Sequence, residues 1–137
     1  MDLGRLEIAT SRRAELLDIT GRVAEALRAA AVGAGLLHVF CPHTTAGVTI
    51  QENADPDVGR DLLLALENAV PERASGGSYR HAEGNSDAHV KACLVGSSQL
   101  VPVARGAMVL GTWQGIFLCE HRLRGQSREL ALHAIGE

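Results

Sequence analysis

The stretch from His81 to Gly96, HAEGNSDAHVKACLVG, is the part of the sequence around which the rest of the chain is organised. Its first half gathers histidines, an asparagine, acidic residues and a lysine, and its second half turns apolar. Ser86 or Asp87 can cap a helix that begins at about Ala88, and Gly96 can end it. A purely structural helix rarely needs so many functional groups at its start, so the stretch predicts a helix that opens at a functional site.

The length and composition predict one domain over residues 1–137, with an aliphatic core. Single domains commonly contain ~100–150 residues. Hydrophobic residues make up 46% of the 137 residues and charged residues 21%, which is typical of a globular protein. Because aromatic residues make up only 3%, aliphatic side chains must fill the core, and the single tryptophan, Trp113, stands out.

The charge and hydropathy of the chain argue against nucleic-acid and membrane partners. The net charge is −3 and the acidic and basic residues are interspersed, so no basic face is available for a phosphate backbone. The apolar runs are far shorter than the ~20 residues that cross a bilayer, and no targeting pattern opens the chain. We therefore expect a cytoplasmic protein.

Hydrophobic patterning divides the chain into short strands and three helices. Alternation and short apolar runs predict strands over residues 6–8, 16–19, 36–41, 46–53, 99–103, 108–110, 113–121 and 126–135. Helical spacing predicts helices over residues 22–32, 56–70 and 88–95, and Asp55 ahead of Pro56 is the expected cap of the second. The pattern predicts an α+β domain in which three helices cover one face of a mainly antiparallel sheet.

Three histidines are candidates for the centre of the site. His81 and His89 flank Asn85 at spacings of four, and His43 lies just before the predicted strand at residues 46–53. Together they offer three imidazoles to a divalent metal, with an open position for water or substrate, as in catalytic zinc sites. No His-Glu-x-x-His zinc motif is present, and the same histidines suit acid–base chemistry because imidazole titrates near neutral pH. Both interpretations stay open at this point.

Glu52 is a second candidate for acid–base chemistry. Its position in the predicted strand places it on the same face as Val48 and Ile50, and a buried glutamate is costly unless it is paired or reactive. Glu52 is therefore a candidate to tune or relay a proton for the histidines. Asp55, by contrast, fits the cap of the following helix.

The stretch from Gly111 to Gly115 has two interpretations. Trp113 either anchors a sheet from within the core or forms a wall of a ligand pocket. In the second case Gln114 is placed to hydrogen-bond the ligand.

Three basic residues, Lys91, Arg122 and Arg124, are available for an anionic substrate, although each is also typical of a solvated surface charge. The chain contains no dinucleotide-binding fingerprint and no phosphate-binding Gly-Lys-Ser/Thr loop. The Gly-x-Ser-x-Gly motif is absent as well.

Several short motifs occur in one order along the chain. They are His43-Thr44-Thr45-Ala46, Glu52-Asn53, Asp55-Pro56-Asp57 with Asp61, His81, Gly84-Asn85, Ala88-His89-Val90-Lys91-Ala92, Gly96-Ser97-Ser98, and Leu110-Gly111-Thr112-Trp113-Gln114-Gly115-Ile116 with Glu120. Together they resemble the YjbQ family, whose members are also known as secondary thiamine-phosphate synthases. Each motif is weak alone, but the ordered set is specific and spans nearly the whole chain. One departure is Ser86-Asp87, where the family often has proline or alanine, at the expected entrance to the pocket.

The resemblance implies a compact α+β fold that assembles as a homotrimer, with the polar clusters at a pocket near the subunit interfaces. The implied activity joins a pyrophosphorylated aminopyrimidine to a thiazole phosphate, which gives thiamine phosphate and releases pyrophosphate. The family name describes this activity as secondary, so the physiological reaction is open.

On this basis we expect a histidine-rich site with a divalent metal, zinc or magnesium, and a small phosphorylated substrate. The expected metal ligands are His43, His81 and His89. The expected catalytic residues are Glu52, His81 and His89. The expected substrate contacts are Thr45, Asn53, Asn85, Lys91, Trp113 and Gln114. The alternatives are a metal-dependent hydrolase of a small phosphorylated or amide substrate and a non-catalytic trimeric ligand-binding module.

Overall fold

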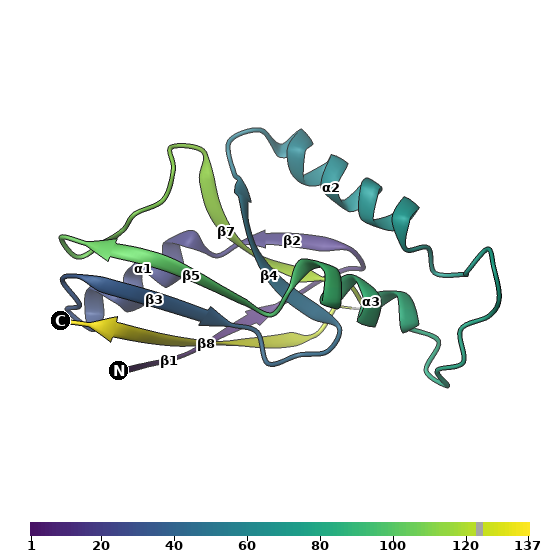
Figure 1. Ribbon diagram of the computed structural model, residues 1–137, viewed down its shortest axis with the longest axis horizontal. Coiled ribbons are helices and arrows are strands. Elements are labelled where there is room, and N and C mark those ends of the chain that lie inside the picture. The colour runs from purple at the N-terminus through teal and green to yellow at the C-terminus, as the bar shows by residue number, and fades with distance from the viewer. Residues whose placement is uncertain (123–124) are drawn as a thin grey trace.

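The computed structural model describes residues 1–122 and 125–137, and its strands form two antiparallel sheets (Figure 1). The larger sheet has the strand order β1 (Asp2–Ala9), β8 (Ser127–Gly136), β3 (Gly35–Phe40), β5 (Ser98–Ala104) and β6 (Ala107–Met108). The smaller sheet has the order β2 (Glu15–Asp18), β7 (Gln114–Glu120) and β4 (Ala46–Glu52). The helices are α1 (Thr20–Ala29), α2 (Pro56–Ala69) and α3 (Ser86–Val95).

The α+β class with three helices is confirmed, and the elements lie close to their predicted ranges. One expectation needs correction, because the strands form two sheets rather than a single sheet covered on one face. The cause is the pairing of β7, which joins β2 along one edge and β4 along the other, while β3 joins β5 and β8. Hydrophobic alternation identifies a strand but carries no information about its pairing partner.

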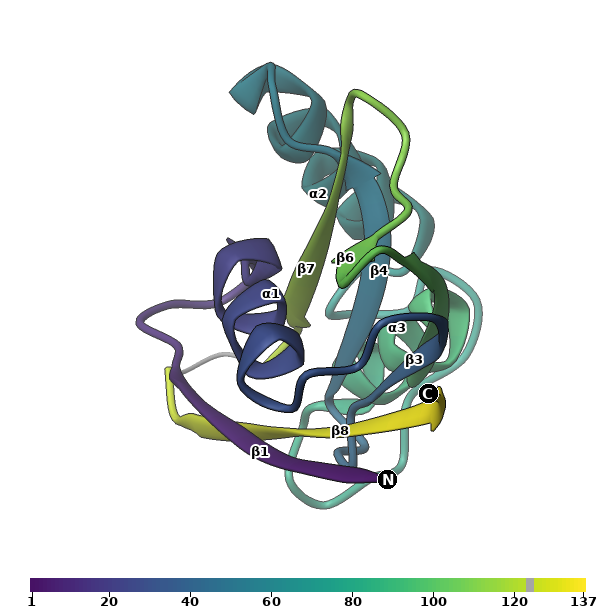
Figure 2. The same cartoon turned by 90° about the vertical axis from the view of Figure 1, so that its left-hand side faces the viewer.

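One aliphatic core fills the space between the two sheets and α1. Val23 and Leu27, spaced by four along α1, are 0% and 1% exposed, and Val39 of β3 and Leu118 of β7 are both 0% exposed. Figure 2 shows α1 beside β7 and above β1 and β8. The prediction of an aliphatic core is therefore confirmed.

A close contact between α3 and β4 sets the position of the polar residues. Gly47 lies where the C-terminal end of α3 meets β4, and a Cβ atom on Gly47 would be only 2.6 Å from the carbonyl oxygen of Gly96. The same oxygen accepts a hydrogen bond from the backbone N–H of Val48 at 3.1 Å. At the other end of α3 the N-cap residue is Asn85, and not Ser86 or Asp87 as predicted. The helix therefore opens directly at the polar stretch.

The helix α2 stands apart from the core. Asp55 caps it as predicted, since its carboxylate accepts a hydrogen bond from the backbone N–H of Asp57 at 2.9 Å. None of its residues is buried, however, and Leu64 is 59% exposed. Figure 1 shows α2 projecting from the body of the molecule. Within residues 1–122 and 125–137, no helix is long and apolar enough to cross a membrane.

Candidate functional site

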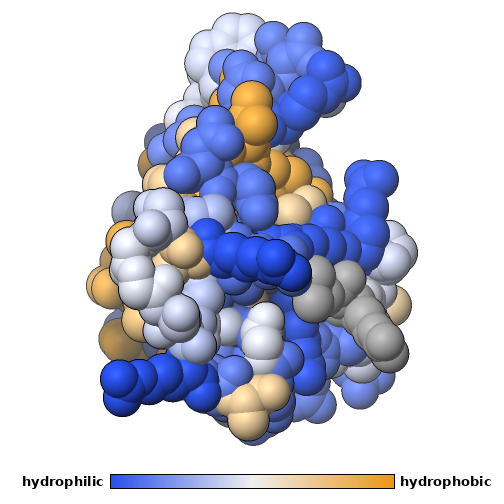
Figure 3. All heavy atoms as spheres, turned by 90° about the vertical axis from the view of Figure 1, so that its right-hand side faces the viewer, coloured by the Kyte–Doolittle hydropathy of each residue, from blue (hydrophilic) through white to orange (hydrophobic). Residues whose placement is uncertain are grey.

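The polar residues around the N-terminus of α3 line one pocket of about 490 Å³, which we call the histidine pocket. Its walls include His43, Thr45, His81, Asn85, His89 and Arg128. They come from the loop after β3, the loop before α3, α3 itself and β8. Five of these six residues belong to the predicted site, so the structure brings that part of the set together. The surface at this end of the molecule is mostly hydrophilic (Figure 3).

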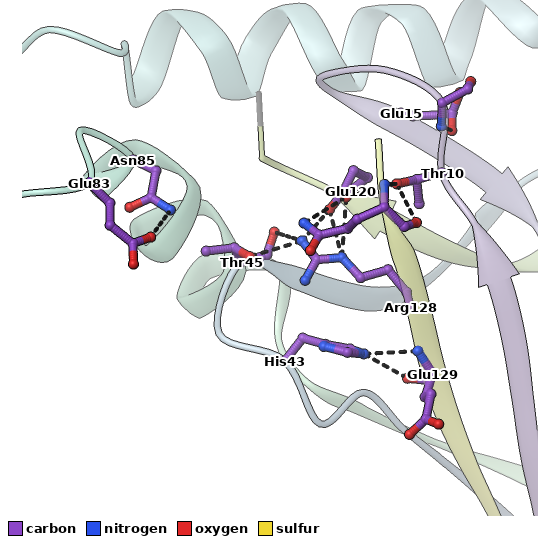
Figure 4. A network of polar contacts seen from close by, with 11 residues as sticks. Thr10, Glu15, His43, Thr45, Glu83, Asn85, Glu120, Arg128 and Glu129 are labelled. Carbon is purple, nitrogen blue, oxygen red and sulfur yellow. Dashed lines mark hydrogen bonds and ion pairs between the residues drawn. The ribbon is translucent and has the colours of Figure 1, made fainter. Parts of the chain in front are cut away.

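A buried ion pair lies behind the histidine pocket. Glu120 at the end of β7 is 0% exposed, and Arg128 of β8 is 3% exposed. The Nε of Arg128 donates to both carboxylate oxygens, at 3.2 and 3.0 Å, and its Nη2 donates to the carboxylate and, at 2.8 Å, to the hydroxyl of Thr45 (Figure 4). The hydroxyl of Thr10 donates to the same carboxylate at 2.8 Å. The Nη1 of Arg128 has no hydrogen-bond partner in the part of the chain that the structure describes.

Sequence reasoning missed this pair, although the strand pattern contains a signal for it. Glu120 lies on the same face of β7 as the core residue Leu118, and Arg128 lies on the same face of β8 as the core residue Leu130. A charge at an apolar position in each of two strands indicates a buried ion pair, because a buried charge needs a partner.

His43 is held by the backbone of β8. Its Nε2 lies 2.9 Å from the backbone nitrogen of Glu129 and 3.1 Å from the carbonyl oxygen of the same residue, so the backbone of Glu129 engages this nitrogen in either tautomer of the ring. Burial, and then the positive charge of Arg128, lower the pKa of His43, which favours the neutral imidazole. In this conformation His43 orders the loop that follows β3, and its Nε2 is not free to bind a metal ion.

His81 and His89 lie side by side in the pocket. Their ring centroids are 5.1 Å apart and the rings meet edge to face at 87°. The described residues contain no group of three His, Cys, Asp or Glu side chains placed to hold a metal ion. The three histidines therefore do not form a preassembled metal centre in this structure, and Nε2 of His43 is engaged by the backbone of Glu129. The adjacent pair His81 and His89 suits proton transfer or contact with an anion.

The amide of Asn85 is only half satisfied, although Asn85 is 4% exposed. Its Nδ2 donates to Oε2 of Glu83 at 3.3 Å (Figure 4), whereas its Oδ1 has no partner among the described residues. A reversed amide would set its oxygen against the carboxylate of Glu83, so this contact fixes the orientation. Buried polar atoms without a partner are uncommon in folded proteins, and the Asn85 oxygen therefore marks an incomplete part of the pocket wall.

Two other predicted site residues, Glu52 and Asn53, lie at the opposite end of β4. With Asp18 they line a second pocket of about 490 Å³ between α2 and the smaller sheet. β4 has seven residues, and a strand rises ~3.3 Å per residue, so about 20 Å separates Glu52 from Thr45 at the histidine pocket. Within one chain the structure therefore separates Glu52 and Asn53 from the three histidines.

Trp113 and Gln114 also lie at that end of the smaller sheet. Trp113 is 64% exposed, so the interpretation of this residue as a buried anchor is wrong. It lines a third pocket together with Glu52 and Asp55. The side-chain oxygen of Gln114 accepts a hydrogen bond from the backbone N–H of Gly111 at 2.8 Å, and Gln114 thereby holds the turn that leads into β7.

Lys91, a predicted substrate contact, is buried in an ion network between α3 and α2. It is 3% exposed, and its Nζ lies 2.6 Å from a carboxylate oxygen of Glu67 and 3.2 Å from one of Asp87. The hydrogen bond from Lys91 is the main cause that lowers the pKa of Glu67. Arg13 joins the network at 2.9 Å from Asp87. Lys91 thus ties α3 to α2.

The other two basic candidates differ in position. Arg122 lines the histidine pocket and pairs with Glu83, with 3.4 Å between Nη2 and Oε2. Arg124 lies outside the described residues. Arg122 and Arg128 are therefore the guanidinium groups that the described residues contribute to the pocket.

Arg128→Met is expected to lower the free energy of unfolding by about 3–5 kcal/mol, because Glu120 would be left buried without its partner. Chemical denaturation at pH 7 measures the change. The matched control is Arg5→Met, since Arg5 pairs with Glu129 through exposed side chains, and its expected cost is below ~1 kcal/mol. Equal losses in the two variants would contradict the role given to the buried pair.

Acidification is expected to destabilise the protein through His121. Burial, and then the positive charge of Lys91, lower the pKa of His121 from 6.5 to about 4. Between these two values the unfolded chain takes up a proton and the folded chain does not, so stability present above pH 6.5 is lost as the pH falls toward 4. The free energy of unfolding should fall by roughly 2–3 kcal/mol between about pH 7 and pH 4.5.

Urea denaturation at the two pH values measures this loss in a pair of variants. His121→Phe removes the buried titrating group and should lose less stability than the wild type. His133→Phe replaces an exposed histidine of β8 and should retain the full loss. The pKa of His43 is lowered too and adds a loss of the same sign, so the two variants are compared with each other. An identical pH dependence in both would show that His121 is not the cause.

Comparison with known proteins places this chain in a family. The family model described as UPF0047 protein YjbQ-like matches residues 4–137. The UPF0047 protein YugU of Bacillus subtilis is 47% identical over 118 residues, which cover 86% of this chain and 88% of YugU. A crystal structure of an uncharacterised conserved YjbQ/UPF0047 protein from Clostridium acetobutylicum is similar with a TM-score of 0.89 and 45% identity, over 96% of this chain and 98% of that chain. A YbjQ-like protein of unknown function from Sulfolobus solfataricus gives a TM-score of 0.90 at 27% identity, over 97% and 95% of the two chains. This chain therefore belongs to the YjbQ-like UPF0047 family.

Proposed function

We propose that this protein is an enzyme that acts on a small phosphorylated molecule in the histidine pocket. The observation that supports this most is the meeting of two kinds of group in one pocket: the adjacent imidazoles of His81 and His89, and the guanidinium groups of Arg122 and Arg128. Imidazoles transfer protons near neutral pH, and a guanidinium group binds phosphate through paired N–H donors. The pocket thus combines a proton-transfer pair with positive charge.

The reaction that we propose is the secondary thiamine-phosphate synthase reaction. The thiazole nitrogen attacks the carbon that bears the pyrophosphate, a C–N bond forms, and pyrophosphate leaves with the electron pair of the broken C–O bond. No protein nucleophile is needed, so positioning and charge neutralisation supply most of the catalysis. Arg122, whose contact with Glu83 is long, and the Nη1 of Arg128, which has no partner among the described residues, are the guanidinium groups that we assign to the leaving pyrophosphate, whereas Lys91 is buried between Glu67 and Asp87.

A divalent metal, zinc or magnesium, is a separate proposal. The adjacent rings of His81 and His89 support it, whereas the contact between His43 and the backbone of Glu129 opposes it. When bound, such an ion would supply positive charge beside the phosphate groups. The residues of the chain act without it in the scheme above, and metal content is therefore measured as one arm of the experiment below.

Self-association as a homotrimer is proposed from the outer face of the larger sheet. Leu37 points into the core, so the alternate residues Leu36 and Phe40 point outward, where they are 41% and 38% exposed. Leu100 and Ile135, on the strands beside β3, are 59% and 68% exposed. Exposed apolar faces of this kind favour association. We propose further that in this trimer Glu52, Asn53, Trp113 and Gln114 of one subunit complete the histidine pocket of a neighbour.

His89→Ala is expected to lower the rate of thiamine phosphate formation from the two heterocycles by at least ~100-fold, because in this proposal its imidazole donates a hydrogen bond or a proton to the leaving pyrophosphate. The control is His133→Ala, an exposed histidine outside the pocket, whose rate should match the wild type. Thermal melting verifies that both variants fold. A rate in His89→Ala equal to that of the wild type would contradict the assignment of the site.

The same samples separate the alternatives. Activity that is lost on chelation and restored by zinc or magnesium supports the metal, and an unchanged rate argues against it. Release of phosphate or cleavage of an amide without the joined product favours a metal-dependent hydrolase. Thermal stabilisation by a phosphorylated ligand, lost in His89→Ala and without any turnover, favours a non-catalytic ligand-binding module.

The wild type is expected to sediment with about three times the 14.5 kDa mass of one chain. Ile135→Glu should shift the distribution toward the monomer, because a charge at this exposed apolar position would be buried at the interface. Glu25→Gln on the outer side of α1 is the control and should leave the mass unchanged. A wild-type protein that is monomeric at every concentration tested would refute the trimer.

A further inference from the structure

We propose that the carboxylate of Glu83 occupies the anion subsite of the histidine pocket in this structure, and that a phosphate group of the ligand displaces it. The inference rests on the proposed function, since it names the place in the pocket where the phosphate binds. It also makes Glu83 a built-in competitor of the ligand rather than one of its contacts.

Two donors of the pocket hold the Glu83 carboxylate. Its Oε2 accepts a hydrogen bond from Nδ2 of Asn85 at 3.3 Å and from Nη2 of Arg122 at 3.4 Å. Glu83, Asn85 and Arg122 all line the histidine pocket, and Arg128 lines it as well. An amide N–H and a guanidinium that converge on one carboxylate oxygen form the kind of donor set that binds a phosphate oxygen.

The hold on Glu83 is weak. Both contacts are long, and the side chains of Glu83 and Arg122 are 61% and 43% exposed, so the pair is screened by solvent. The amide of Asn85 gains only one bond from the arrangement, because its buried Oδ1 stays without a partner among the described residues. A ligand that carries more negative charge than one carboxylate therefore competes well for the same donors.

The local backbone lets Glu83 leave without unfolding the site. Glu83 lies in a tight turn closed by a hydrogen bond from the N–H of Gly84 to the carbonyl of His81 at 3.1 Å. Gly84 has a positive φ of 70°, which glycine adopts without strain. Rotation of the Glu83 side chain empties the subsite while this turn, and the His81 that it carries, can stay in place.

The experiment uses inorganic pyrophosphate as the probe and isothermal titration calorimetry as the readout. Glu83→Gln removes the competing charge and is expected to bind pyrophosphate about five- to tenfold more tightly than the wild type, because a larger fraction of the protein is free to bind. The matched control is Glu25→Gln, which makes the same change of net charge on α1, away from the pocket, and should alter the affinity less than about twofold.

Arg122→Gln supplies the second arm of the experiment. It should weaken pyrophosphate binding about tenfold or more, and Glu83→Gln should then lose most of its effect in the Arg122→Gln background, because the two groups act at one subsite. Tighter binding in Glu83→Gln alone together with this coupling supports the inference. Affinity in Glu83→Gln that is lower than in the wild type, or equal to that of Glu25→Gln, overturns it.

Failure of the inference and failure of the proposed function give different results. If the wild type binds pyrophosphate, His89→Ala binds it more weakly and Glu83→Gln binds it no more tightly, the phosphate site stands and the competing role of Glu83 is refuted. If pyrophosphate binds neither the wild type nor Glu83→Gln at millimolar concentration, both the proposed phosphate site and the inference drawn from it are refuted.

Discussion

The fold and the candidate site depend on one buried ion pair, between Glu120 and Arg128. Glu120 ends a strand of the smaller sheet and Arg128 belongs to the larger sheet, so the pair joins the two sheets at the edge of the aliphatic core. Thr10 and Thr45 add hydrogen bonds to the carboxylate and the guanidinium. A buried pair of charges is tolerated when its hydrogen bonds are completed in this way. The same guanidinium faces the histidine pocket, so the pair supports the pocket as well as the fold.

The pocket lies where two kinds of stabilisation meet. On one side α3 is held by contact between its C-terminal end and Gly47, in a region of close apolar packing. On the other side α3 is tied to α2 through Lys91, Asp87 and Glu67. Because α2 buries no residue of its own, this ion network is a main contact between α2 and the rest of the molecule. The N-terminus of α3, with Asn85 and His89, is therefore positioned by a rigid core and by a more polar outer layer.

The sequence predicts the elements of this fold well and their assembly poorly. Alternation and capping residues such as Asp55 are local signals, so strands and helices appear at nearly the predicted residues. The separation into two sheets depends on which edges of β7 are paired, and no local pattern reports that. The distance of about 20 Å between Glu52 and the histidine pocket follows instead from the length of β4 alone, since the two lie at opposite ends of this strand.

Within the site, residues that lie in the same segment as α3 or just before β4 are predictable from the sequence, whereas partners that are distant in sequence are not. His81, Asn85 and His89 share one local segment, and His43 and Thr45 precede the strand on which α3 packs. Lys91 was expected to be accessible because a lysine usually is, but Glu67, 24 positions earlier in the chain, buries and pairs it. The role of Arg128 is not predictable because its partner Glu120 lies on another strand. The sequence does show that Arg128 shares a face of β8 with Leu130.

The Glu120–Arg128 pair supports both the fold and the pocket, and this limits which substitutions the pocket tolerates. A change of charge at the inner wall of the pocket destabilises the whole domain, so that wall resists evolutionary drift. Glu83 and Arg122, in contrast, are exposed and support little of the fold, so substitutions there cost little stability. Substitutions that change the ligand preference are therefore tolerated best at the rim of the pocket, because the rim can change without loss of the buried pair.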